Sequence, residues 1–118
     1  MVEPGPYTVE QHFAGRSPEV RKIYRRLLAA SRALGPVAEE AKKTSIHLVA
    51  KTAFAGVATR REALILTLKS EADIESPRVG KREHASAHRW HLEIKLARAD
   101  EVDAELSEWL ARSYRLAG

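Results

Sequence analysis

Residues 89–96 read Arg89-Trp90-His91-Leu92-Glu93-Ile94-Lys95-Leu96, a strict alternation of polar and apolar side chains. Successive side chains of a β-strand point to opposite faces of the sheet. A period of two therefore predicts a strand with one buried face and one polar face. The apolar face has to be covered by another layer of the protein. The polar face, which carries Arg89 and His91, is free to contact something else.

Two amphipathic helices are predicted, one on each side of the strand-rich middle of the chain. The first begins at Ser17-Pro18, a favourable N-cap followed by proline at the first helical position, and it ends at Gly35-Pro36. The second is expected to begin after Asp100, acting as its cap. The first helix has an apolar face at helical spacing: Val20, Ile23, Tyr24, Leu27, Leu28 and Leu34. The second helix has a similar face: Val102, Leu106, Trp109, Leu110 and Tyr114.

Between the helices, short alternating or apolar runs separated by polar turns predict strands joined as antiparallel hairpins. These runs are an edge strand within 37–43, a strand within 44–50, a run at 53–58 that is apolar or small on both parities, and a strand within 63–69. The run at 53–58 is typical of a strand buried on both faces. The sequence therefore predicts an α+β fold, a two-layer sandwich. In it a four- to five-stranded, mainly antiparallel sheet carries the N-terminal and C-terminal helices on one face.

The chain has 118 residues, enough for a single domain spanning 1–118, with a loose arm at 1–6 and a long basic loop at 70–86. Its composition, 44% hydrophobic and 31% charged, is that of a folded globular protein. No apolar run is long enough for a membrane helix, and the start lacks the pattern of a signal peptide. The absence of cysteine excludes disulfides and thiolate chemistry. We expect a cytoplasmic protein with no cofactor and no membrane contact.

The polar face of the sheet is the first candidate site. Its predicted ligand or partner surface comprises Lys43, His47, Arg89 and His91. Arginine and histidine on a sheet could bind an anion, because arginine offers a forked set of donors. Val49 and Ile65 fall on the same face, and a partly apolar face of this kind is also how homodimers form. We therefore expect a non-catalytic binding domain that self-associates as a homodimer or docks through this face, while a bound ligand and a plain solvated face remain open.

Basic residues form the second candidate, a patch that comprises Arg21, Arg25, Arg78, Lys81 and Arg82. Clustered basic side chains bind polyanions, including nucleic acids, by releasing counterions. However, no helix-turn-helix, zinc finger or ribonucleoprotein motif is present, and most aromatic residues fall on core parities. Nucleic-acid binding is therefore the runner-up to docking through the sheet face.

Enzymatic and metal sites have less support in the sequence. No glycine-rich phosphate loop, nucleophile elbow or metalloprotease motif occurs, so no catalytic residue is predicted. A small enzyme that uses His47 and His91, with Asp73 or Glu75 reaching them from the loop, is the weaker alternative. His84, His88 and His91 would align on a helix, but on a strand His88 and His91 point to opposite faces. No metal site is predicted.

Several motifs, taken in order, are similar to those of a known family: Thr8-Val9-Glu10-Gln11-His12-Phe13, Ser17-Pro18-Glu19-Val20, Gly35-Pro36-Val37, Lys43-Thr44-Ser45-Ile46-His47-Leu48, Phe54-Ala55-Gly56-Val57, and the closing Trp109-Leu110 to Ser113-Tyr114. The chain resembles domain-of-unknown-function family 5655, a group of small uncharacterised bacterial domains. It departs from the family pattern at Thr59, where proline is common, and at Ser113, where alanine is common. The resemblance implies an α+β domain and provides no catalytic residues to transfer.

Overall fold

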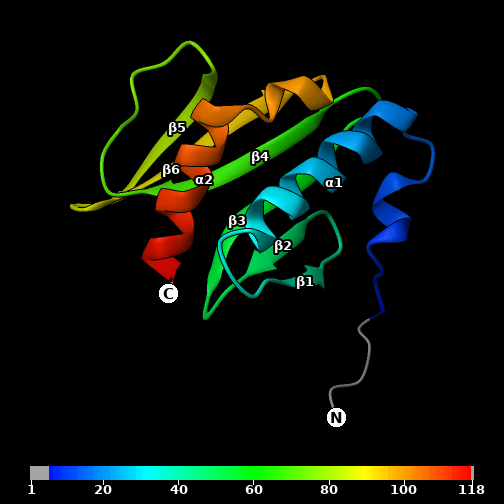
Figure 1. The fold of residues 1–118 in the computed structure, drawn as a ribbon, viewed down its shortest axis with the longest axis horizontal. Coiled ribbons are helices and arrows are strands. Elements are labelled where there is room, and N and C mark those ends of the chain that lie inside the picture. Colours follow the sequence, from blue (N-terminus) through cyan, green and yellow to red (C-terminus); the bar gives the residue numbers. More distant parts are fainter. Residues whose placement is uncertain (1–5, 118) are drawn as a thin grey trace.

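The computed structural model describes residues 6–117, so most of the arm expected at residues 1–6 lies outside the described residues. Within the described range the elements follow one another in this order: η1 (Glu10–Phe13), α1 (Pro18–Arg32), β1 (Ala38–Ala41), β2 (Ile46–Val49), β3 (Ala53–Thr59), β4 (Leu64–Ser70), β5 (Val79–Ser86), β6 (Arg89–Leu96), η2 (Ala99–Glu101) and α2 (Ala104–Ala117). The strands form one sheet in the order β1-β2-β3-β4-β6-β5, and all neighbours are antiparallel (Figure 1).

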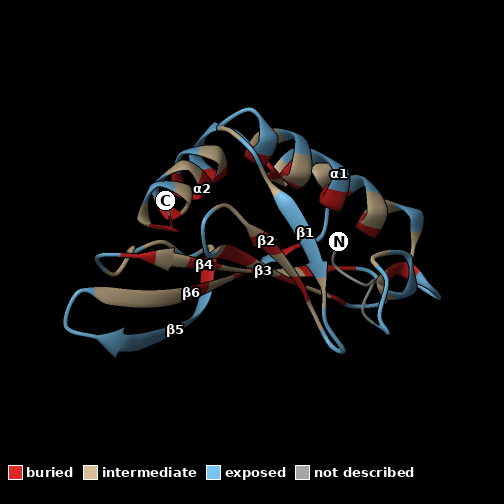
Figure 2. Cartoon of the chain, turned by 90° about the horizontal axis from the view of Figure 1, so that it is seen from below, coloured by how far each residue is buried: buried red, intermediate tan, exposed pale blue. Residues whose placement is uncertain are grey.

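Both helices pack on the same face of the sheet, and the buried residues lie between these two layers (Figure 2). The inner face of the sheet contributes leucine and isoleucine side chains at alternate positions, and α1 and α2 contribute the apolar faces predicted for them. Fully buried members of this core include Ile23, Leu27, Ile46, Leu48, Leu64, Leu66, Leu92, Ile94, Leu96, Leu106 and Leu110. The prediction of a two-layer α+β sandwich is therefore confirmed.

The loop predicted at 70–86 is wrong in its second half, because residues 79–86 form β5, the strand beyond β6 at the edge of the sheet. Only Val79 of this strand is buried, and the other seven residues are exposed. An edge strand beyond the helix layer needs no apolar face. Its sequence, rich in charged residues, therefore has the pattern of a loop. The described sheet therefore has six strands, where the sequence predicted four to five.

Three local predictions also need correction. Asp100 lies in η2, whereas Asp103 caps α2 by accepting a 3.0 Å hydrogen bond from the Leu106 amide. Leu34 is 40% exposed because α1 ends at Arg32, before the helical face would reach it. Strand β3 is buried on its inner side only, and Gly56 and Ala58 on its outer side remain partly exposed.

A bulge interrupts β3 at Phe54 and changes how the helix layer contacts the sheet. Leu48 pairs with Ala55, but Val49 pairs with Ala53, so Phe54 is an extra residue in the ladder. The pairing of β3 with β4 also stops at Ala55. The fully buried hydroxyl of Ser113, on α2, donates to the Phe54 carbonyl and accepts from the Lys69 amide at 3.0 Å. One helix side chain thus joins two strands where their own hydrogen bonds end.

Thr59 has a comparable role at the other end of β3. Its hydroxyl donates to the His12 carbonyl and accepts from Arg16 Nε at 3.0 Å. Thr59 is 6% exposed, so these bonds satisfy a buried polar group and attach η1 and the segment after it to the sheet. Thr59 and Ser113 are therefore both buried and hydrogen-bonded.

Candidate functional site

The outer face of the sheet, opposite the helices, is not covered by any helix of the described residues (Figure 2). The strand register places one row of side chains across this face. His47 on β2 is the partner of Gly56 on β3, Gly56 is the partner of Thr67 on β4, and Thr67 is the partner of Glu93 on β6. A glycine therefore lies near the middle of the outer face, with larger polar residues on both sides.

A groove of about 320 Å³ lies over this glycine. Its floor is made of the small residues of β3, among them Gly56 and Ala58. Its polar lining comes from β2 and the turn before it, on one side of β3, and from β4 and β6 on the other: Ser45, His47, Thr67, Lys69 and His91. None of the aspartates and glutamates that the structure describes lines the groove. We call this site the outer groove.

Gly56 is not required by the backbone of β3. The positive-φ glycines among the described residues are Gly15 and Gly35, so Gly56 has a conformation open to any residue. A Cβ atom added to Gly56 would meet only the Thr67 Cβ, at 3.7 Å, which is ordinary van der Waals contact. Glycine within a strand lowers stability and often marks a close approach by a ligand or another backbone. The feature that glycine provides here is open space.

Lys69 and His91, two polar residues that line the outer groove, differ in their side-chain partners. Lys69 forms no ion pair within 4.0 Å in the described part of the chain, while Ser113 fixes its backbone from the other side of the sheet. His91 Nδ1 lies 3.3 Å from Glu83 Oε1 on β5, and the His91 side chain is 39% exposed. The Glu83 contact orients the His91 ring and leaves its other nitrogen for the groove.

The structure brings only part of the predicted sheet surface together. His47 and His91 line the outer groove, but Lys43 lies in the exposed turn before β2 and Arg89 lies at the start of β6, and neither lines the groove. The sequence prediction did not include Thr67, Lys69 or Gly56 in the site. The outward parity of Thr67 and Lys69 was visible, and the small residues at 53–58 were the one signal for a hollow.

Most of the predicted basic patch is engaged in intramolecular ion pairs. Arg21 lies 2.7 Å from Glu10, and its guanidinium stacks over the Phe13 ring at 4.9 Å. The hydrogen bond from Arg21 lowers the pKa of Glu10 below its usual value. Arg82 lies 2.7 Å from Asp73. Arg25 and Lys81 form no ion pair within the described residues, but they come from separate elements, α1 and β5.

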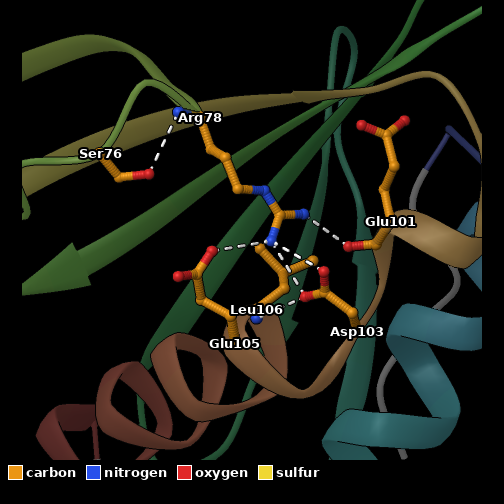
Figure 3. A network of polar contacts seen from close by, with 6 residues as sticks. All are labelled: Ser76, Arg78, Glu101, Asp103, Glu105 and Leu106. Atoms are coloured by element: carbon orange, nitrogen blue, oxygen red, sulfur yellow. Dashed lines mark hydrogen bonds and ion pairs between the residues drawn. The ribbon is translucent and has the colours of Figure 1, made fainter.

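Arg78, the fifth member of the patch, attaches the loop after β4 to the start of α2 (Figure 3). Its Nη1 donates to Asp103 Oδ1 at 3.0 Å and to Glu105 Oε1 at 3.1 Å, and its Nη2 donates to the Glu101 carbonyl at 2.6 Å. The guanidinium also lies over the Trp109 ring at 5.6 Å. With these partners satisfied, Arg78 has a structural role and is not available to an anion in solvent.

The three histidines considered for a metal have different places in the fold, and His88 lies in the turn between β5 and β6. His84 stacks on Trp90 with ring centroids 4.2 Å apart, whereas His91 lines the outer groove. Across residues 6–117, no three metal-binding side chains gather closely enough to hold an ion. Among the helices that the structure describes, none has both the length and the apolar character needed to cross a membrane.

Comparison with known proteins gives one match. The model of a domain of unknown function, DUF5655, matches residues 9–117. No curated protein and no solved structure matches the chain.

Proposed function

The chain belongs to the DUF5655 family, and we propose that it is a non-catalytic binding domain whose ligand occupies the outer groove. A cytoplasmic location, expected from the sequence, is part of this proposal. Its main support is the glycine at position 56, below the groove. A strand interior that could accept a side chain without strain instead has a glycine, and the space above that glycine is lined by polar groups.

The groove also has the character of a binding site. Small-molecule sites combine an apolar lining with a few convergent polar groups. The outer groove has a floor of glycine and alanine and polar groups from His47, Thr67 and Lys69. The two hydroxyls of the groove, on Ser45 and Thr67, form no hydrogen bond to a histidine in the described structure, whereas an activated nucleophile needs such a bond. This favours binding over catalysis.

The substitution Gly56→Val tests the proposal. Anilinonaphthalene sulfonate, a fluorescent dye with an apolar body and one anionic group, serves as the probe. The valine side chain fills the groove, so we expect the affinity for the dye, measured by fluorescence titration, to fall about tenfold. The free energy of unfolding is expected to stay the same or rise, because valine suits a strand better than glycine does.

Gly80→Val is the matched control. Gly80, like Gly56, lies in a strand, and a Cβ atom added to it would meet no atom within 4 Å. Gly80 does not line the groove. Wild-type affinity for the dye is expected in this variant. Equal binding by Gly56→Val and the wild type would overturn the proposal.

Two sequence-based alternatives stay predictions. Self-association would use the same outer face, where Ile65 on β4 pairs with Ala58 at the end of the groove. Nucleic-acid binding would use the basic patch, but three of its five residues, Arg21, Arg78 and Arg82, already pair with carboxylates. Those ion pairs favour the outer groove as the binding site.

A further inference from the structure

We infer that the ligand of the outer groove is a small organic acid, with an anionic group held by Lys69 and the histidines and an apolar body on the floor. This inference rests on the proposed function and specifies the chemical class of the ligand. Its basis is the polar lining: two imidazoles, two hydroxyls and one ammonium that has no ion-pair partner within residues 6–117, with no carboxylate among the described lining residues.

Lys69 is the centre of this charge arrangement. Its backbone amide donates to Ser113 on α2, and Lys69 pairs with His91 on β6, so the side chain extends from a strand position with a fixed backbone. The side chain has no carboxylate within 4.0 Å among the described residues. A lysine ammonium has three donors and no acceptor, so an anion is the partner that satisfies it.

His91 is the direct neighbour of Lys69 across the β4–β6 pairing. Its Nδ1 faces Glu83 at 3.3 Å, and no hydrogen bond within the described structure uses the opposite ring nitrogen. Because Nδ1 carries the proton that faces Glu83, the opposite nitrogen donates to an anion when the ring carries both protons. His47 lines the groove from β2, on the far side of Gly56. The outer face does carry another carboxylate, Glu93 opposite Thr67, but Glu93 does not line the groove. The donors therefore lie around the glycine floor, and the acidic groups lie outside it.

The floor of the groove determines which apolar body the ligand can have. Gly56 and Ala58 present backbone and methyl groups, so a flat apolar body fits where a side chain would otherwise stand. The volume of about 320 Å³ is near the lower end of the range for small-molecule sites, roughly 300–1,000 Å³. A carboxylate or a phosphate joined to one aromatic ring has these properties, and both anions accept the same donors.

Isothermal titration of the full chain with benzoate, phenyl phosphate and benzamide tests the inference. Benzamide has the shape of benzoate without its charge, so we expect benzoate or phenyl phosphate to bind about tenfold more tightly than benzamide. The tighter of the two anions shows which acid group the site prefers. Lys69→Met keeps the aliphatic stem and removes the charge. It is expected to lower the affinity for the anions about tenfold and to leave that for benzamide unchanged.

Lys95→Met is the matched control, because Lys95 is an outward-facing lysine on β6 that does not line the groove. Its affinities for all three compounds should equal those of the wild type. Equal binding of benzoate and benzamide, lost in Gly56→Val, would overturn the inference and leave the proposed function standing. Binding that neither Gly56→Val nor Lys69→Met alters would overturn both.

Discussion

Replacing Ser113 by alanine is expected to lower the free energy of unfolding by about 2–4 kcal/mol. The Ser113 hydroxyl is fully buried and is the partner of both the Phe54 carbonyl and the Lys69 amide. Alanine leaves these two backbone groups buried without partners, and each such loss costs roughly 1–3 kcal/mol. Urea denaturation followed by circular dichroism measures the change.

Ser107→Ala on the same helix is the control for helix propensity, because Ser107 forms no side-chain hydrogen bond within the described residues and lies away from the bulge. Replacing serine by alanine raises the helix propensity by a similar amount at both positions. The difference in unfolding free energy between the two variants therefore reports the two hydrogen bonds of Ser113. Hydrogen exchange adds a local readout, since the Lys69 amide should exchange faster in Ser113→Ala. Equal unfolding free energies for the two variants would show that the Ser113 hydrogen bonds do not stabilise the sheet.

Asp103→Ala is expected to lower the free energy of unfolding by about 1–2 kcal/mol near neutral pH, the usual effect of losing an N-cap. Asp103 accepts from the Leu106 amide and also pairs with Arg78, as Figure 3 shows. The Leu106 hydrogen bond, followed by the Arg78 contact, lowers the pKa of Asp103 below its ordinary value of 3.8. The carboxylate thus stabilises the fold above that value, and the stabilisation is lost as the pH falls through the lower, folded-state pKa.

The difference in stability between the wild type and Asp103→Ala should therefore be largest near neutral pH and shrink in strong acid. Asp103→Asn separates the two roles of the residue, because asparagine caps a helix well but does not carry the charge that pairs with Arg78. It should fall between the wild type and the alanine variant. A difference that is constant from neutral to strongly acidic pH would contradict the role assigned to the carboxylate.

The sequence was sufficient for the two helices and for the strands whose faces differ strongly in polarity. The alternation from Arg89 to Leu96 predicted β6 and its buried face, because a central strand covered by helices must be apolar on one side. The same rule explains the failure at β5. An edge strand beyond the helix layer has no such constraint, so Arg82 and His84 occupy it without an apolar pattern.

The site was predictable only in part, for a related reason. Parity alone placed His47 and His91 on one face, and the structure confirms that both line one groove. Lys69 joins them through the strand order, which pairs β4 with β6 after a long connection that local patterns do not reveal. The residues at 53–58 were small on both parities and were therefore read as buried, whereas Gly56 provides open space on the outer face.

Binding of an organic acid in the outer groove can be measured residue by residue. The most direct measurement is amide shift perturbation in proton–nitrogen NMR spectra of the full chain during titration with benzoate. Saturable shifts are expected at the amides around the groove, those of Gly56, Thr67, Lys69 and His91, with little change along α1. Shifts confined to the helix layer, or small and uniform shifts over the whole chain, would contradict it.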